Sequence, residues 1–324
     1  MPRRLLLFAV ALALSATACA ASSSTSTSPA SGAPASGGSV DPSTFAAQVA
    51  SPDLYVGPPQ AVQIGVFSSD AQSGVSLLTS GTIDMQIGPY QGGSGTPTQT
   101  TAHYVPAPGT AGSASGTPAL TTPDVARGVY QADDVKFDAP GVWQAQVSFT
   151  LDGTPVQLST QFQVKADPAL PAPGQDAFRT QNLTMSSKVD PQAIDSRAID
   201  GAKVPDPELH QHTIAQAIAA GKPALVLFST PVYCQSQFCG PSTDALEQIA
   251  KAHPNEAYYI HVEIWGNYAK GQINAAAKQW LYRNGDLTEP WLFLIGPDGK
   301  IAQRWGPLFD PQEVVQALDR VANG

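Results

Sequence analysis

The sequence predicts a multidomain protein, with an all-β region at residues 53–165 and an α/β region at residues 206–324. In the first region apolar residues alternate with a period of two and turn residues separate the runs, which predicts half-buried strands. In the second region continuous apolar runs alternate with helical stripes, a pattern typical of a sheet covered by helices. The length of 324 residues agrees with this division, because domains usually span ~100–200 residues.

The charge of the chain argues against two classes of partner. Lys and Arg number 17 against 26 Asp and Glu, so the net charge is −9 and the isoelectric point is near 4.9. Nucleic-acid binding needs a basic surface, and docking on anionic lipid needs clustered basic residues. We therefore expect no nucleic-acid partner and no electrostatic docking on lipid.

The first 19 residues have the pattern of an export signal. Two arginines near the start precede an apolar run that is too short to span a bilayer. Ala16-Thr17-Ala18-Cys19 then resembles the lipobox of bacterial lipoproteins, although Ala16 replaces the usual bulky residue. The resemblance implies that Cys19 is lipidated and anchors the chain on the extracytoplasmic face of the bacterial cell membrane. Ordinary signal-peptidase cleavage at the same Ala-x-Ala sequence is the alternative.

Two segments of the chain are predicted to connect the folded regions. Residues 20–52 are rich in Ser, Thr, Ala, Pro and Gly, so they bury too little apolar surface to fold and form a disordered tether. Residues 166–205 form a connector that carries Pro, Asp and Ser. Its apolar residues Phe178, Leu183 and Met185 predict that it packs in part against a folded region.

The region 53–165 is expected to be a small antiparallel sandwich. The alternation of Val62, Ile64 and Val66 is typical of its strands, and Asp-Gly at 152–153 predicts a hairpin turn. The Gly-, Thr- and Pro-rich residues 91–125 predict a long loop. The pattern resembles the immunoglobulin-like domains that precede redox domains in some exported bacterial proteins. We expect no catalytic residues here.

Residues 206–324 predict a defined order of elements. A short helix at 213–220, capped by Thr213, is followed by the order β, α, β, α, β, β, α. The expected strands are 223–228, 257–265, 291–295 and one that begins at Ile301, and the expected helices are the segment around 245–249, 272–282 and 311–321.

This order, with Cys234 and Cys239 at the first strand-to-helix junction, resembles the thioredoxin-like superfamily. Glu289-Pro290 lies just before the third strand, where thioredoxins have their cis-proline. The resemblance implies that Cys234 and Cys239 are the catalytic pair. It also implies that Pro290, with Glu289 before it, borders the groove that binds the substrate backbone, because a proline has no N–H to donate.

The spacing of the cysteines departs from the thioredoxin pattern, because Cys234 to Cys239 is C-x4-C rather than C-x2-C. Residues five apart on one ideal helix have Cα atoms roughly 8.7 Å apart, beyond the ~7 Å limit of a disulfide. Cys234 is therefore expected on a loop and Cys239 in or before the first helical turn. We assign Cys234 as the attacking and Cys239 as the resolving cysteine. The rival assignment, in which Cys239-Gly240-Pro241-Ser242 is a Cys-Gly-Pro-Cys motif that lost its last cysteine, reverses these roles.

The preferred function is thiol–disulfide exchange on exported thiol or disulfide proteins. Some features of thioredoxins are missing, since Leu227 replaces their buried Asp. Glu263 is a candidate to act for it, and the alternative is a surface or ion-paired glutamate. The alternative is a non-catalytic binding or assembly module in which the disulfide only closes a loop. Copper chaperones of this fold add a histidine to two cysteines, but His261 is more simply a structural strand residue, so we expect neither a metal nor a cofactor.

Overall fold

The computed structural model describes residues 40–70, 74–234 and 236–323. The predicted signal segment with Cys19, and most of the predicted tether, lie outside these residues. Among the helices in the described part of the chain, none combines the length and the hydropathy that crossing a membrane requires.

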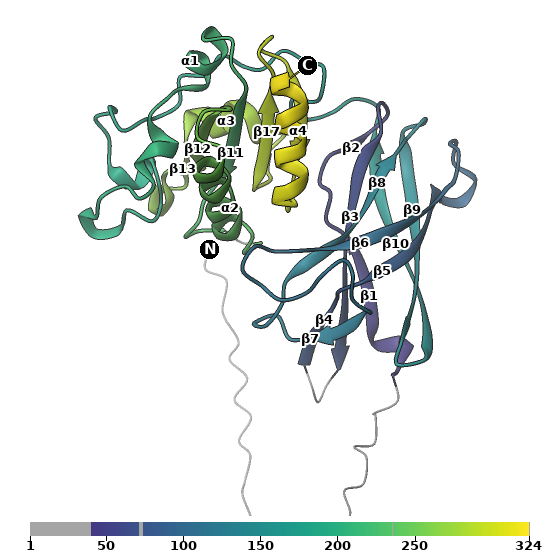
Figure 1. Cartoon of the computed structure of the whole chain (residues 1–324). Coiled ribbons are helices and arrows are strands. Elements are labelled where there is room, and N and C mark those ends of the chain that lie inside the picture. The colour runs from purple at the N-terminus through teal and green to yellow at the C-terminus, as the bar shows by residue number, and fades with distance from the viewer. Residues whose placement is uncertain (1–39, 71–73, 235, 324) are drawn as a thin grey trace, which may run out of the picture. The chain divides into compact units, whose positions relative to one another are not determined.

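The N-terminal region of the described chain is a ten-stranded, largely antiparallel sheet (Figure 1). The strand order is β2-β10-β9-β5-β6-β8-β3-β4-β7, and β1 pairs with β3. The strands are β1 (Phe45–Val49), β2 (Leu54–Tyr55), β3 (Gln60–Asp70), β4 (Gly74–Thr79), β5 (Thr82–Pro89), β6 (Thr98–Pro106), β7 (Ala119–Thr121), β8 (Gly128–Val135), β9 (Gly141–Leu151) and β10 (Thr154–Lys165).

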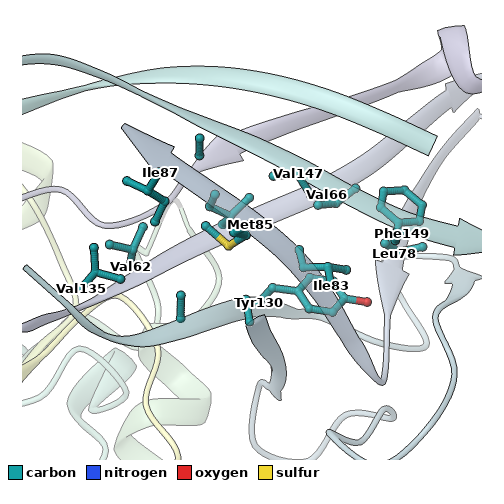
Figure 2. Packing of buried hydrophobic residues seen from close by; sticks show 14 of the residues in the cluster. Val62, Val66, Leu78, Ile83, Met85, Ile87, Tyr130, Val135, Val147 and Phe149 are labelled. Atoms are coloured by element: carbon teal, nitrogen blue, oxygen red, sulfur yellow. The ribbon is translucent and has the colours of Figure 1, made fainter. Parts of the chain in front are cut away.

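The core of this region has the predicted alternation. Val62, Ile64 and Val66 of β3 are buried in one apolar cluster with residues of β5, β8 and β9. Figure 2 shows these side chains meeting across the strands, among them Met85 and Val147. The predicted all-β character is therefore confirmed, but the hydrogen-bonded order is continuous, so the strands form one curled sheet rather than two separate ones.

Two boundaries predicted from composition need correction. Strand β1 lies inside the predicted tether 20–52, because Phe45 is buried against Phe149 and the β1 backbone pairs with β3. Strand β6 lies inside the predicted loop 91–125, where Ala102 and Tyr104 are buried. In both places a few buried residues and hydrogen-bond ladders, one for β1 and two for β6, outweigh a composition that by itself favours turns.

The C-terminal region has a four-stranded sheet in the order β12-β11-β17-β18. Strands β11 and β12 are parallel, and β17 is antiparallel to β11 and to β18. The elements are α1 (Ile214–Ala219), β11 (Ala224–Ser229), α2 (Cys239–Ala252), β12 (Tyr258–Glu263), α3 (Ala275–Leu281), β17 (Trp291–Ile295), β18 (Ile301–Trp305) and α4 (Pro311–Asn323). Two short hairpins, β13 (Trp265–Asn267) with β14 (Gln272–Ile273) and β15 (Tyr282–Arg283) with β16 (Asp286–Leu287), complete it.

Helices cover both faces of this sheet because β11 is apolar on both sides. Leu225 and Leu227 contribute to a core with α2 and α4, whereas Val226 and Phe228 contribute to a second core with α1 and α3. Figure 1 shows α2 and α4 beside the strands. The element order and the two-sided packing agree with the prediction and make this region thioredoxin-like.

Helix α1 is capped by Thr213, as predicted, and the structure adds a capping box with Gln216. The Thr213 hydroxyl accepts the N–H of Gln216 at 3.1 Å, and the Gln216 side-chain oxygen accepts the N–H of Thr213 at 2.8 Å. Two of the N–H groups near the start of the helix are therefore satisfied without water.

The connector at 166–205 packs more extensively than its apolar residues predict. Phe178 and Met185 have 37% and 41% of their surface accessible, but Phe178 meets Trp280 edge-on and Leu183 is partly buried beside Ile194. Buried residues of the connector lie at Leu170, Ala172 and Ala177 and also around two short 3-10 helices, η3 (Pro191–Ala193) and η4 (Ile199–Gly201), where they include Asp195 and Ser196. The connector thus contributes polar groups to the interior of the C-terminal region.

Candidate functional site

A disulfide lies at the start of α2. Cys234 follows β11 on a loop, Cys239 is the first residue of α2, and their Cα atoms are 5.9 Å apart. The placement of one cysteine on the loop and one in the first helical turn agrees with the geometric prediction. Gln237 has a φ of 64°, in the left-handed region, where the loop turns back toward the helix.

The two sulfur atoms differ in their surroundings. The Cys239 side chain is fully buried, whereas Cys234 is partly exposed. The backbone N–H of Cys239 donates to Cys234 Sγ at 3.3 Å, and the Ser236 hydroxyl lies 3.3 Å from the same sulfur. Donors at a helix N-terminus stabilise a thiolate, so these contacts favour negative charge on Cys234 when the pair is reduced.

Glu289 and Pro290 lie beside the disulfide. The peptide bond between them is cis, as predicted, and Pro290 is buried. A carboxylate oxygen of Glu289 and the two sulfur atoms all lie within 4.8 Å of one another. Burial, together with the negative charge of Glu263, raises the pKa of the Glu289 carboxyl to about 7. A carboxyl group that titrates near neutral pH is therefore within reach of both sulfurs.

Glu263, the candidate to act for the buried Asp of thioredoxins, is bound by backbone N–H groups. Its two oxygens accept backbone N–H groups, from Ser196 at 2.8 Å and from Trp265 at 3.2 Å. Its side chain is nearly completely buried, and burial raises the pKa of its carboxyl. The described carboxylate that groups with the two sulfurs is that of Glu289, not Glu263.

Aromatic side chains border the disulfide on the loop side. Tyr233 stacks on Tyr268, with ring centroids 3.9 Å apart and planes 4° from parallel, and Trp265 meets Tyr268 edge-on. These rings, with Phe238 and Pro290, line one wall of a groove of about 770 Å³, and residues of the N-terminal region such as Phe67 line another part. The groove is apolar along this wall, so it suits an extended segment with apolar side chains.

Asp195, His210 and His261 form a buried polar network near the loop that carries Cys234, and the sequence pattern indicates little of it. Asp195 comes from the connector, His210 from the 3-10 helix η5 (Pro207–His210), and His261 from β12; all three side chains are inaccessible to solvent. Burial would raise the pKa of Asp195, but the two histidines and Arg197 outweigh it and hold this pKa far below its usual range. The only indication of this network in the sequence is that Asp195 and Arg197 lie two residues apart in a stretch that contains Ala and Ile residues.

No protein-family model and no curated protein matches this chain. Among solved structures, it is similar to the pneumococcal exposed lipoprotein thioredoxin Etrx1 from Streptococcus pneumoniae strain TIGR4, at 18% identity. The alignment covers 34% of this chain and 90% of that chain, with a TM-score of 0.24. The thioredoxin-like description of the C-terminal region therefore rests on its strand order and on the helices over its two faces.

Proposed function

We propose that this protein is a thiol–disulfide oxidoreductase that acts on exported proteins, with Cys234 as the attacking and Cys239 as the resolving cysteine. The observation that carries the proposal is the asymmetry of the pair, because Cys234 is partly exposed and accepts a helix N–H whereas Cys239 is fully buried. An attacking thiol must be accessible and stabilised as a thiolate, and a resolving thiol needs neither property before the intermediate forms.

In the reductive direction the chemistry has two steps. The Cys234 thiolate attacks one sulfur of a client disulfide, the client S–S bond breaks, and the departing client sulfur takes a proton from water. Cys239 then attacks Cys234, the Cys234–client bond breaks, and the Cys234–Cys239 disulfide forms as the client accepts two electrons. A second exported dithiol protein returns the pair to the reduced state, and oxidation of a client follows the same steps in reverse.

Glu289 supplies the proton acceptor that the second step requires. The Cys239 thiol is buried, so it must pass its proton to a nearby group before its sulfur becomes nucleophilic. The Glu289 carboxylate lies within 4.8 Å of both sulfurs. Its pKa of about 7 lets it accept a proton from Cys239 and return it to the released client thiolate near neutral pH. Pro290 and the aromatic groove hold the client chain beside the disulfide.

The proposal places the protein at the outer face of the cytoplasmic membrane. Cys19 would carry the lipid anchor, and the segment after it would separate the anchor from the folded regions. The clients are then exported proteins with free thiols or disulfides, presented to the groove as extended segments with apolar side chains.

Single-cysteine variants test this function. Cys239→Ala should leave a thiol that alkylates quickly at neutral pH and traps clients as mixed disulfides, while Cys234→Ala should leave a slow thiol that traps little. Alkylation rates measured against pH give the pKa of each thiol. A faster thiol in Cys234→Ala would establish the reversed assignment. If neither thiol titrates below the ordinary value of about 8.5 and no client is trapped, the disulfide only closes a loop.

A further inference from the structure

The buried group formed by Asp195, His210 and His261 has the composition of a metal site. The three residues come from separate segments, and each side chain has 0% accessibility. Their ligand atoms all lie within 4.8 Å of one another. Two imidazoles and one carboxylate are ligands that zinc and similar divalent transition metals accept.

The distances fit coordination better than hydrogen bonding. Asp195 Oδ2 lies 3.4 Å from His210 Nε2 and 3.3 Å from His261 Nδ1. Neither contact is a hydrogen bond, and both ring nitrogens of His210 lack a hydrogen-bond partner among the described residues. Ligand atoms around a tetrahedral zinc are about 3.3–3.4 Å apart, because the metal–ligand bonds are about 2.0–2.1 Å long.

The proton positions on His261 make the same point. The Thr243 hydroxyl donates its proton to the Cys239 carbonyl at 2.9 Å. In the 2.8 Å contact between Ser229 and Thr243, the Ser229 hydroxyl is therefore the donor and the Thr243 oxygen is the acceptor. Ser229 Oγ must then accept from His261 Nε2 at 2.9 Å, and the Ser229 carbonyl 3.3 Å from that nitrogen can also only accept. Nε2 therefore carries a proton, and in a neutral ring the lone pair of Nδ1 points at the carboxylate of Asp195.

A lone pair that faces a carboxylate oxygen is repulsive unless a proton or a metal ion lies between them, and the 3.3 Å contact of His261 Nδ1 with Asp195 is not aligned as a hydrogen bond. The surroundings already provide the second layer of contacts typical of metal sites, since Ser229 orients His261 and Arg197 orients Asp195. Arg197 Nε donates to Oδ1 at 3.0 Å and Nη2 donates to Oδ2 at 2.7 Å. Asp206, 2.8 Å from the same guanidinium, offsets its charge.

We propose that Asp195, His210 and His261 bind a divalent transition metal of the zinc class, with a water molecule as the fourth ligand. The metal would join the connector and η5 to β12. Because the site is closed to solvent, the ion enters as the chain folds. This site is separate from the disulfide and does not depend on the proposed exchange activity.

Metal content after refolding tests the proposal. The full-length chain, with Cys234→Ser and Cys239→Ser to remove thiolate ligands, is unfolded and refolded with Zn²⁺ or with a chelator. We expect one zinc per chain, a higher melting temperature for the zinc-loaded protein, and tetrahedral Co²⁺ absorption after refolding with cobalt. His210→Ala should lose the metal, and Ser229→Ala should weaken binding about 10–100-fold. His212→Ala, which removes an exposed histidine two residues away, is the matched control.

Three results would overturn the proposal. The first is a chain that folds equally well with and without Zn²⁺ and contains no metal. The second is zinc that remains in His210→Ala, which would place it at the more exposed cluster of Asp206, Glu208 and Glu247. The third is a nitrogen NMR spectrum in which both ring nitrogens of His261 carry protons, because a proton on Nδ1 would then occupy the place of the metal. The metal content and the spectrum of the parent chain decide the question even if His210→Ala does not fold.

Discussion

Arg304 and Asp53, 251 residues apart in sequence, form an ion pair within the described part of the chain. Arg304 Nη1 lies 2.9 Å from Asp53 Oδ2, and only 7% and 2% of the two side chains are accessible. The guanidinium also lies over the rings of Tyr55 and Trp291, each 5.1 Å from its carbon. Burial would raise the pKa of Asp53, but Arg304, Lys165 and two backbone N–H groups outweigh it and lower this pKa.

Arg304→Met should therefore destabilise the fold strongly. The change leaves the Asp53 carboxylate buried with only part of its compensation, and breaking a buried pair in this way costs about 3–5 kcal/mol. The free energy of unfolding in urea measures the loss. Lys300→Met is the control, because its pair with Asp176 is exposed and should contribute less than about 1 kcal/mol. Equal effects of the two variants would contradict the buried ion pair.

The raised pKa of Glu289 predicts a specific pH dependence of stability in the disulfide form. Its pKa is about 7 in the folded chain against 4.5 for an ordinary glutamate, so between these values the folded chain binds more protons than the unfolded chain. The Glu289 contribution to the free energy of unfolding should therefore fall as the pH rises from about 4.5 to about 7. Glu289→Gln should remove this fall, whereas Asp286→Asn, in a neighbouring exposed turn, should retain it. Identical pH profiles for Glu289→Gln and the parent would show that Glu289 titrates normally.

Reduction of the disulfide should leave the C-terminal region folded. The loop closed between Cys234 and Cys239 is short, so the chain-entropy model gives a contribution of about 2 kcal/mol. The two apolar cores of the sheet, which do not depend on the disulfide, should hold the fold after this loss. Circular dichroism melting with and without a phosphine reductant measures the effect. Unfolding at room temperature upon reduction would instead identify the disulfide as a structural staple.

Lipidation of Cys19, which remains a proposal, is tested on the protein produced in its native cell. We expect the mature protein to begin at Cys19, to carry acyl chains and to sediment with membranes, because the sequence before this cysteine resembles a lipobox. Cys19→Ser should release the protein into the soluble exported fraction. Mass spectrometry that finds an unmodified mature N-terminus on the native protein would replace lipidation with ordinary signal-peptidase cleavage.

The sequence by itself determined the main helices and sheet strands of the C-terminal region, but not its hairpins β13–β14 and β15–β16. The run from Ala224 to Phe228 is apolar at every position, which predicts a strand covered on both faces, and Thr213 predicts the start of α1. The placement of Cys239 in the first helical turn followed from helix geometry, whereas the cis bond between Glu289 and Pro290 followed from the resemblance to thioredoxins. These features depend on residues close together in the chain, so spacing and residue type are sufficient to predict them.

Tertiary structure alone decided which polar groups meet. Asp195 was one acidic residue in a connector, and only folding places it against His210 and His261. Glu289 was assigned to substrate binding, and its position within 4.8 Å of both sulfurs depends on the loop that carries Cys234. The strands β1 and β6 formed in segments whose composition favours turns, because partners far away in sequence supplied hydrogen bonds and buried area. Long-range contacts of this kind depend on how the whole chain packs, which local pattern does not contain.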